Sequence, residues 1–219
     1  MIKDTHLIFV KEWQLDNPRV SERPEEVDIF KLPPPEIRHG LPLMQALRER
    51  QSSREFDPEA LSQHVLSNLL WAASGVNRPE TGGRTAPSAQ NWHEIDVYVA
   101  TAAGLFIYDA ARHVLMHMLR QDIRSATGLQ AFAGTAPVDL IYVADFARTA
   151  GATEEERRVY TVANIGFIAQ NVYLFCASEG LATVVRGAID RPALARTMNL
   201  AHDQSIILAQ TVGYPARTH

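Results

Sequence analysis

The sequence predicts an α+β fold for this chain of 219 residues. Strand-like and helical stretches alternate along it without the regular β-α-β order that a doubly wound sheet requires. The stretch 104–119 has two strand-like halves around a turn at 109–113, which indicates a hairpin. Hydrophobic residues make up 46% of the chain, so a single domain of this length can bury a sizeable core.

The charge balance gives no electrostatic reason to expect a nucleic acid or an anionic membrane as partner, because 25 acidic residues outnumber 21 basic ones. Cysteine occurs once, at Cys176, which rules out an intrachain disulfide and fits a reducing compartment. The apolar run at 7–10 has only four residues, too few for a secretory or membrane-spanning segment. We therefore expect a cytoplasmic protein without a membrane partner.

Residues 1–40 differ in composition from the rest and predict an extended N-terminal arm. They are polar, carry Pro18 and Pro24, and approach their end with the proline run at 33–35. Proline-rich segments are extended and form no core of their own. Scattered apolar residues indicate that the arm packs onto a body formed by residues 41–219, and a disordered tail is the alternative. These apolar residues include Ile8, Phe9, Trp13, Ile29 and Phe30.

The first part of the body predicts two helices separated by a loop. Residues 42–50 have the apolar spacing of a short helix, and residues 51–57 have the composition of a loop. A second helix begins either at Asp57 or at Ser62. The segment 75–94 that follows this helix is long for a loop inside a compact domain, and loops of such length are often functional.

The second part of the body predicts most of the sheet and one long helix. Thr153 and Glu156 match a capping box that opens a helix running to about residue 178. Its apolar residues lie on more than one face, which is typical of a core helix or of a subunit-interface helix. A short helix capped by Asp190 runs to about Asn199. Strands are predicted at 94–100, 137–146, 181–187 and 204–213.

Several common active-site motifs are absent from the sequence. It contains no G-x-G-x-x-G for a dinucleotide, no Walker loop and no G-x-S-x-G nucleophile elbow. His113 and His117 lack the glutamate of H-E-x-x-H and fall in the predicted hairpin, so we expect no metal site there. Cys176 lies in the long apolar helix and is expected to be a buried structural thiol, not a nucleophile.

The segment Arg50–Arg54, R-Q-S-S-R, places two arginines and two serines between two predicted helices. Guanidinium groups suit phosphate because they are planar, permanently charged and able to form two parallel hydrogen bonds. Serine adds a short donor. The segment is therefore a candidate anion site, and a solvated, charged helix end is the alternative.

The segment 85–94, T-A-P-S-A-Q-N-W-H-E, gathers small, amide, aromatic and imidazole side chains in a loop that leads into a strand. Such a loop can surround a flat polar ring with amide hydrogen bonds and cover it with an aromatic side chain. The alternative is an ordinary turn rich in proline, serine and asparagine. Taken alone, neither this segment nor Arg50–Arg54 identifies a ligand.

Four segments, taken in order, resemble the FMN-dependent nitroreductase family from about residue 41 to the C-terminus. R-Q-S-S-R-E-F at 50–56 resembles the family's opening R-R-S-x-R-x-F, and P-S-A-Q-N-W-H-E at 87–94 resembles its P-S-x-x-N-x-Q. E-G-L-A-T-V-V-R-G-A-I-D at 179–190 resembles its third flavin segment, and I-L-A-Q-T-V-G-Y-P at 207–215 resembles its final strand. Each motif is loose, whereas the ordered set of four is fairly specific.

The resemblance implies an α+β homodimer in which a mostly antiparallel central sheet is flanked by helices. Members of the family build two FMN sites at the dimer interface, each from both chains. On that pattern Arg50, Ser52 and Arg54 would hold the phosphate, the ribityl chain and the pyrimidine edge of FMN. Arg217 would be the closing phosphate contact.

Two further segments complete the site that the resemblance implies. After Val185, the backbone amides of Arg186 and Gly187 would lie near the flavin N5 and O4 atoms. The other subunit would approach the same flavin with Pro87, Ser88 and Asn91.

Three positions in the implied site depart from the family's pattern. Gln51 stands where a second basic residue is common, and Ala89 stands where a second serine is frequent. His93 replaces the usual glutamine. All three are retained as candidate cofactor-binding residues.

The chemistry that the resemblance implies belongs to the cofactor. We expect an FMN-dependent NAD(P)H oxidoreductase that reduces nitroaromatic, quinone or related small-molecule acceptors by ping-pong hydride transfer through flavin N5. The protein would supply orientation and electrostatics, without a side-chain acid or nucleophile. Two alternatives stay open: an FMN-dependent dehydrogenase of the thiazoline-oxidase type that acts on a peptide-derived heterocycle, and a non-catalytic flavin-binding protein. In a dimer, we expect the N-terminal arm to be ordered against the partner subunit.

Overall fold

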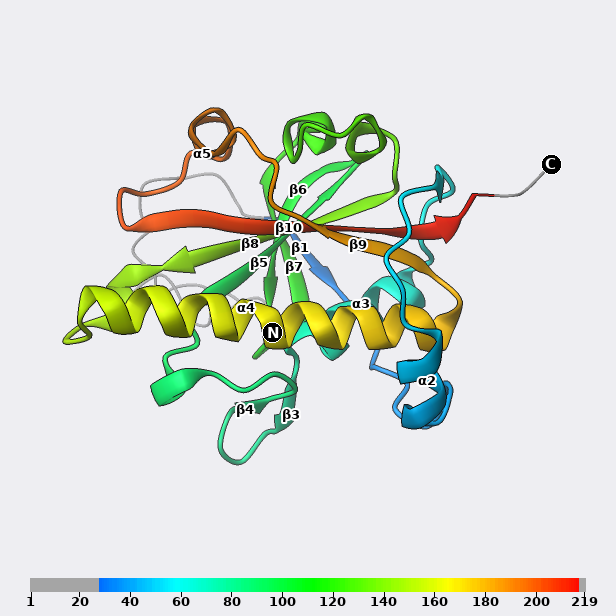
Figure 1. Cartoon of the computed structure of the whole chain (residues 1–219), viewed down its shortest axis with the longest axis horizontal. Coiled ribbons are helices and arrows are strands. Elements are labelled where there is room, and N and C mark those ends of the chain that lie inside the picture. Colours follow the sequence, from blue (N-terminus) through cyan, green and yellow to red (C-terminus); the bar gives the residue numbers. More distant parts are fainter. Residues whose placement is uncertain (1–27, 217–219) are drawn as a thin grey trace, which may run out of the picture.

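The computed structural model describes residues 28–216, which form an eight-stranded sheet with helices on its two faces (Figure 1). The strand order is β1-β7-β6-β5-β8-β10-β2, and β9 also pairs with β10. Every pairing is antiparallel, which confirms the predicted α+β class and the mostly antiparallel sheet. The strands are β1 (Ile29–Lys31), β2 (Phe56–Asp57), β5 (Ile95–Thr101), β6 (Gly104–Asp109), β7 (Val114–Leu119), β8 (Val138–Asp145), β9 (Ala182–Arg186) and β10 (Gln204–Pro215).

Each predicted helix forms, and local capping groups set where three of them begin. The Thr153 hydroxyl accepts from the Glu156 N–H at 3.2 Å, and the Glu156 carboxylate accepts from the Thr153 N–H at 2.8 Å. Ser62, not Asp57, caps the second helix, since its hydroxyl accepts from the Val65 N–H at 3.3 Å. The helices are α2 (Leu43–Glu49), α3 (Gln63–Ser74), α4 (Glu154–Glu179) and α5 (Arg191–Met198).

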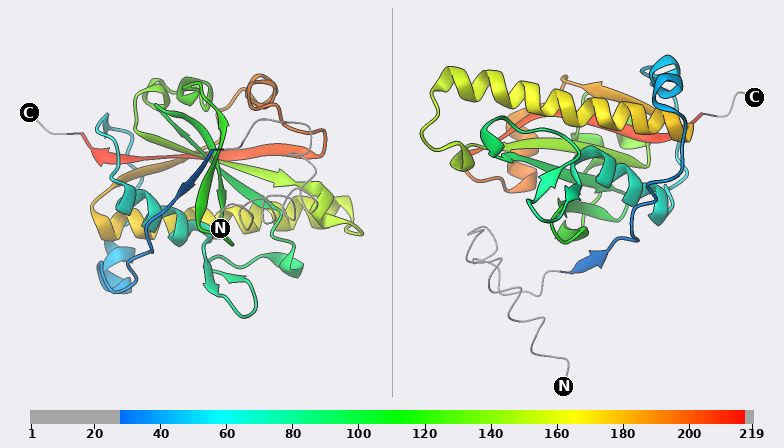
Figure 2. Two further views of the ribbon diagram at one scale, coloured as in Figure 1. Left: turned by 180° about the vertical axis from the view of Figure 1, so that it is seen from behind. Right: turned by 90° about the horizontal axis from the view of Figure 1, so that it is seen from below.

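The core has two layers, one on each face of the sheet. Strand β8 is buried at all of its positions, as its continuous apolar sequence predicts. Alternate residues of β8 face opposite sides, so Tyr142 packs with residues of α3 and α4, whereas Ile141 packs with residues of α5. Figure 2 shows α4 lying along one face of the sheet. Residues at the two ends of this long helix therefore contact parts of the molecule that are far apart.

Three elements differ from the sequence expectation, and for β2 and β10 the reason is that the pairing partners are distant in the chain. The predicted loop 51–57 ends in the short strand β2, which pairs with β10. That pairing also carries β10 to Pro215, beyond the expected end at Gly213. The predicted loop 75–94 contains a small hairpin of β3 (Val76–Arg78) and β4 (Gly83–Arg84), followed by the 3-10 turn η2 (Ala89–Asn91).

The described part of the predicted arm, residues 28–40, joins the sheet of its own chain. Strand β1 extends the sheet edge by pairing with β7, and the Phe30 ring packs edge-on against the Phe106 ring at 5.6 Å between centroids. Contact of the arm with a partner subunit stays a prediction. Its anchors Phe9 and Trp13, and also Arg217, lie outside the described residues.

By length and composition alone, α4 could cross a membrane. The core helix of a soluble protein meets the same criterion, so this observation is weak. Seven side chains of α4 are buried against the protein, among them Asn164 and Val172. Helix α4 also carries Asn164 and Tyr173, polar side chains that contact two separate loops of the chain.

Candidate functional site

Two of the four predicted flavin segments are bonded together at the C-terminal end of α4, and the end of β10 lies beside them. The loop after α2 is bonded to β9, because the Ser53 N–H donates to the Thr183 carbonyl at 2.9 Å. A cavity of about 260 Å³ lies beside this contact, and Gln51, Tyr173 and Pro215 line it together with Ser53 and Thr183. The structure therefore brings the loop Arg50–Arg54, strand β9 and the end of β10 into one region, which we call the α2–β9 region.

Tyr173 of α4 links the first two of these segments. Its hydroxyl lies 2.8 Å from the Ser52 hydroxyl and accepts from the Val185 N–H at 3.0 Å. The guanidinium carbon of Arg50 lies 5.4 Å from the centre of the Tyr173 ring, within the range of a cation–π contact. One side chain thus contacts three residues that the sequence assigns to the cofactor.

The two arginines of this region carry charges that no described carboxylate neutralises. Neither the Arg50 nor the Arg54 guanidinium forms an ion pair or hydrogen bond with any residue in 28–216, and Arg54 is exposed. The neighbouring Arg48 is different, because its Nη2 lies 2.8 Å from Glu49 Oε1. Two guanidinium groups without a carboxylate partner, four residues apart on one loop, fit a phosphate.

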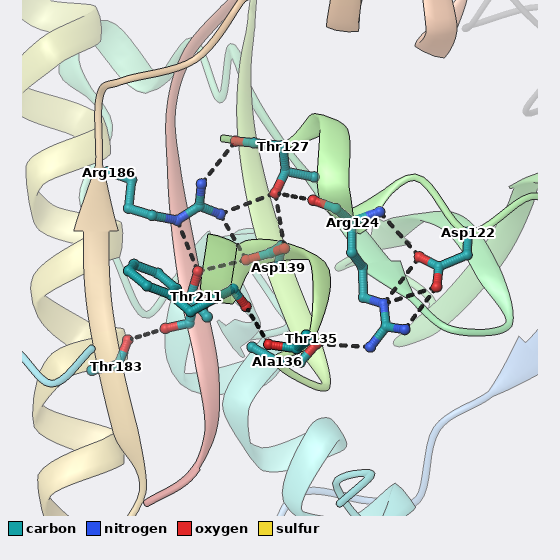
Figure 3. A network of polar contacts seen from close by, with 10 residues as sticks. Asp122, Arg124, Thr127, Thr135, Ala136, Asp139, Thr183, Arg186 and Thr211 are labelled. Atoms are coloured by element: carbon teal, nitrogen blue, oxygen red, sulfur yellow. Dashed lines mark hydrogen bonds and ion pairs between the residues drawn. The ribbon is translucent and has the colours of Figure 1, made fainter. Parts of the chain in front are cut away.

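The Arg186 side chain, by contrast, is fully used inside the core (Figure 3). Its Nη2 donates to Asp139 Oδ1 at 2.7 Å, and its Nε donates to the Thr211 hydroxyl at 2.8 Å. Thr127 accepts two further hydrogen bonds, through its carbonyl and its hydroxyl. The residue can therefore offer a cofactor only its backbone, which is the role that the resemblance implies; that role stays a prediction.

Strand β9 presents alternate backbone groups to its outer edge. The Val185 N–H and the Thr183 carbonyl both point away from β10, toward Tyr173 and Ser53. Because backbone groups alternate along a strand, the N–H of Gly187 is the next one on this outer edge. Two backbone donors are predicted here, at Arg186 and Gly187. Of these, the Gly187 N–H is the one that faces the outer edge.

The remaining predicted segment, residues 87–94, lies near the N-terminal half of α4 and is held by a buried carboxylate. Glu94 is fully buried and accepts from Asn164 Nδ2 at 2.9 Å and from the Ser88 hydroxyl at 3.3 Å. Asn164 in turn accepts from the Ala89 N–H at 3.1 Å, and Ser88 accepts from the His93 N–H at 3.0 Å. We call this set of contacts the Glu94 hub.

The backbone around the Glu94 hub is strained. Gln90, Asn91 and His93 have φ angles of 52°, 56° and 48°, in the left-handed region that residues with a Cβ rarely adopt. Such conformations persist where the surroundings fix them, and they cluster at ligand sites. The hub supplies that fixation, so the loop has one defined shape.

His93 is held in its neutral form. Burial lowers the pKa of His93, and the positive charges of Arg84 and Arg148 lower it further, while Glu94 acts in the opposite direction. Arg148 also donates to the His93 carbonyl at 2.8 Å. A neutral imidazole can accept as well as donate a hydrogen bond, as the glutamine usual at this position also can.

The two regions are far apart within one chain. Asn164 and Tyr173 are nine residues apart on α4, which corresponds to about 14 Å along the helix axis. Figure 1 shows α2 at one end of α4, whereas β4, which precedes the segment 87–94, lies below the middle of the helix. The predicted residues of the α2–β9 region are Arg50, Gln51, Ser52, Arg54, Val185, Arg186 and Gly187. Those near the Glu94 hub are Pro87, Ser88, Ala89, Asn91 and His93.

Sequence reasoning missed three residues that organise these regions: Tyr173, Glu94 and Asn164. A signal was present for Asn164, because an amide in the middle of an apolar helix needs a partner when it is buried. Tyr173 carried a weaker signal of the same kind. It lies among the apolar residues of the helix, and the partners of its hydroxyl come from 121 and 12 residues away in sequence.

Other features carry no predicted site residue. A cavity of about 710 Å³ lies between β1, the proline run and the β6–β7 turn, and includes Trp71 and Arg112 in its lining. Within residues 28–216 no group of three or more metal-ligating side chains occurs. Cys176 is buried, and burial raises the pKa of its thiol well above the ordinary value, as a structural cysteine requires.

The sequence and the fold of this chain match one group of known proteins. The family model described as the nitroreductase family matches residues 47–214. A candidate nitroreductase from Methanocaldococcus jannaschii is 32% identical over 171 residues, which are 74% of this chain and 85% of the relative. The chain therefore belongs to the nitroreductase family, as its sequence motifs predict, and its general class is that of a flavin oxidoreductase.

Solved structures agree with this assignment. The crystal structure of a candidate nitroreductase from Ralstonia eutropha has a TM-score of 0.83 at 47% identity, covering 87% of this chain and 90% of that chain. The NADPH:FMN oxidoreductase of Vibrio harveyi, complexed with NAD+, has a TM-score of 0.60 at 17% identity and covers 80% of this chain and 69% of its own. At that identity the second likeness concerns the fold alone.

Proposed function

We propose that this chain is an FMN-dependent NAD(P)H oxidoreductase that acts as a homodimer. The observation that carries the proposal is the pair of guanidinium groups at Arg50 and Arg54, which lack a carboxylate partner among the described residues and lie beside the outer edge of β9. A phosphate would satisfy them, and the adjacent strand edge offers a backbone donor.

The residues present fit FMN in kind and in order. Arg50, Ser52 and Arg54 would bind its phosphate and polar tail, and the Gly187 N–H would donate to the flavin ring. Bound FMN supplies the acceptance and release of hydride, which no side chain here provides. The protein contributes cations that favour a negatively charged flavin, and a neutral imidazole at His93.

Two observations support a site built from two chains. The Glu94 hub lies about 14 Å along α4 from Tyr173, and the small cavity beside the hub shares no lining residue with the cavity of the α2–β9 region. The cavity of about 260 Å³ in the α2–β9 region is smaller than the roughly 300–1,000 Å³ usual for ligand sites. A second chain would complete the pocket with Pro87, Ser88, Ala89, Asn91 and His93.

Exposed apolar side chains offer the surface for such a dimer. On α2 they are Leu43, Met44 and Leu47, and on α4 they are Val159, Val162 and Phe167. Large apolar side chains exposed on the surface of helices are typical of an interface. Light scattering of the flavin-loaded protein should give a dimer at micromolar concentration, and a stable flavin-loaded monomer would exclude the two-chain site.

The electron donor is NADH or NADPH, and the acceptor is a nitroaromatic, a quinone or a related small molecule, with ping-pong kinetics. The Vibrio harveyi neighbour that shares this fold is an NADPH:FMN oxidoreductase, and the proposed donor and cofactor follow that example. A dehydrogenase acting on a peptide-derived heterocycle and a flavin-binding protein without turnover are the other outcomes of the test.

The visible spectrum of the purified protein, followed by anaerobic titration with NADH and NADPH, tests the proposal. We expect flavin absorption bands that bleach with at least one donor and return with menadione or a nitrofuran. A yellow protein that neither donor bleaches would exclude NAD(P)H oxidoreductase activity. A protein that takes up no FMN would exclude the cofactor itself.

A further inference from the structure

Within this site, we infer that Tyr173 is a positioning residue that orients Ser52 and Arg50 toward the phosphate of FMN. The inference rests on the proposed function, since it concerns how the α2–β9 region holds that cofactor. Tyr173 belongs to none of the four motifs that resemble the family, and it contacts two of them from the C-terminal half of another element, α4. Its role follows from three contacts and from the direction in which protons are donated.

The first step is the direction of the hydrogen-bond chain. A backbone N–H can only donate, so the Tyr173 oxygen accepts from Val185 at 3.0 Å. The single tyrosine proton then needs an acceptor, and the Ser52 oxygen lies 2.8 Å away. If Ser52 donated instead, the tyrosine oxygen would accept twice and its own proton would have no partner among residues 28–216. Donation from Tyr173 to Ser52 is thus the arrangement that gives the tyrosine proton a partner within the described chain.

The second step is the consequence for Ser52. A hydroxyl group that accepts from Tyr173 keeps its own proton for another acceptor. Ser52 is exposed on the loop after α2, so this proton is available to an FMN phosphate bound there. Serine in this state donates to an anion, whereas serine without Tyr173 could turn its proton elsewhere. The chain from Val185 through Tyr173 thus prepares a donor for a phosphate oxygen.

The third step concerns Arg50. Its guanidinium lies over the Tyr173 ring at 5.4 Å, and it has no competing carboxylate among the described residues. The ring restricts a long side chain that would otherwise lose conformational entropy on binding. The same tyrosine therefore places a cation and a hydroxyl donor on the same loop, and both favour a phosphate over a neutral group.

A tyrosine that serves only the core behaves differently, and the chain contains one. Tyr142 of β8 is fully buried, and its hydroxyl donates to Gln210 Oε1 at 2.6 Å. That contact involves none of the predicted cofactor residues. Tyr142 is therefore the matched control for Tyr173, since the same substitution removes one hydrogen-bonded hydroxyl from each.

The experiment compares the dissociation constants of FMN and riboflavin, measured by quenching of flavin fluorescence on the apoprotein. Riboflavin lacks the phosphate. Tyr173→Phe keeps the ring under Arg50 and removes the hydroxyl, so we expect FMN to bind about tenfold more weakly and riboflavin within about twofold of wild type. Ser52→Ala should have a similar effect. The FMN dissociation constant of the double variant should exceed that of the more affected single variant by no more than about twofold.

The outcomes separate this inference from the proposed function. Wild-type protein that binds no FMN would overturn the proposed function and the inference with it. If wild-type protein binds FMN and Tyr173→Phe has the same FMN dissociation constant, the inference alone is overturned. It is also overturned if the fold-changes of the two single variants multiply fully in the double variant. Ser52→Ala changes an exposed residue and keeps the test decisive if Tyr173→Phe folds poorly. Tyr142→Phe should lower the thermal midpoint and leave FMN affinity within about twofold.

Discussion

The two regions along α4 use opposite means to shape a site. In the α2–β9 region the predicted residues are cations and hydroxyls on a loop, and Arg50 and Arg54 lack a carboxylate partner in the part of the chain that the structure describes. At the Glu94 hub the predicted residues are fixed by a buried carboxylate and an amide of α4. One region offers charge, and the other offers a rigid shape.

The difference shows why neither region is a binding site alone. Exposed cations attract an anion but define its position poorly, because long side chains keep many conformations. A strained loop defines a shape but offers little charge, and His93 within it is held neutral. A site made from both regions gains affinity from one and geometry from the other.

The largest effect that we expect comes from removing the centre of the rigid region. Glu94→Leu should lower the free energy of unfolding by about 3 kcal/mol, because Asn164 and Ser88 lose a buried acceptor. Urea unfolding measures it. Glu49→Leu removes an exposed carboxylate paired with Arg48 and should cost less than about 1 kcal/mol. A Glu94→Leu protein as stable as Glu49→Leu would mean that the hub does not fix the loop.

Local signals in the sequence predicted most of the elements correctly. The capping box at Thr153 and Glu156 and the cap at Asp190 act within three residues, so their signals lie next to the ends that they define. Strand β2 could not be predicted in this way, because Phe56 and Asp57 gain their partners from the other end of the chain. The same holds for the end of β10 at Pro215.

The candidate site was predicted by motif and not by geometry. The resemblance selected Arg50, Ser52 and Ser88 because these residues recur in order, and the chain does belong to that family. The residues that hold them, Tyr173 and Glu94, act across folds of the chain that no local pattern specifies. Their discovery required the structure, since a polar group in a core is understood only when its partner is known.

The next largest effect concerns the charged region. Arg50→Ala and Arg54→Ala should each weaken FMN binding by roughly 10- to 100-fold, since a hydrogen bond to a charged group contributes about 1.5–3 kcal/mol. Dialysis followed by measurement of flavin occupancy tests this. Both variants should stay folded and regain colour with excess FMN, and lysine at either position should rescue only partly.

Arg48→Ala is the control for these two variants. Arg48 lies on the same stretch of chain, but Glu49 already neutralises it at the surface. The Arg48→Ala protein should therefore keep its flavin. If all three variants kept full occupancy after extensive dialysis, the phosphate assignment of this loop would be wrong.

A smaller effect should come from the strained backbone of the rigid region. Gln90 has a φ of 52°, which glycine adopts without a steric penalty. Gln90→Gly should therefore raise the free energy of unfolding by about 1 kcal/mol. Ala89→Gly, one residue earlier at an ordinary φ, should lower it by a similar amount. Equal effects of the two substitutions would show that the left-handed conformation stores no strain.

The smallest effect is a dependence of stability on pH that belongs to the rigid region. Burial, with Arg84 and Arg148, lowers the folded-state pKa of His93 below its unfolded value of about 6.5. Between these two values the unfolded chain binds more protons, so stability falls as the pH falls below about 6.5. One histidine contributes at most about 0.7 kcal/mol between pH 7 and pH 6. His93→Gln, the residue usual in the family, should remove that contribution from urea unfolding curves, and Arg84→Met should reduce it because one of the two repelling charges is gone. An identical pH dependence in wild type and His93→Gln would mean that the fold does not hold the imidazole neutral. The α2–β9 region and the Glu94 hub would then differ in rigidity but not in the charge that they offer a ligand.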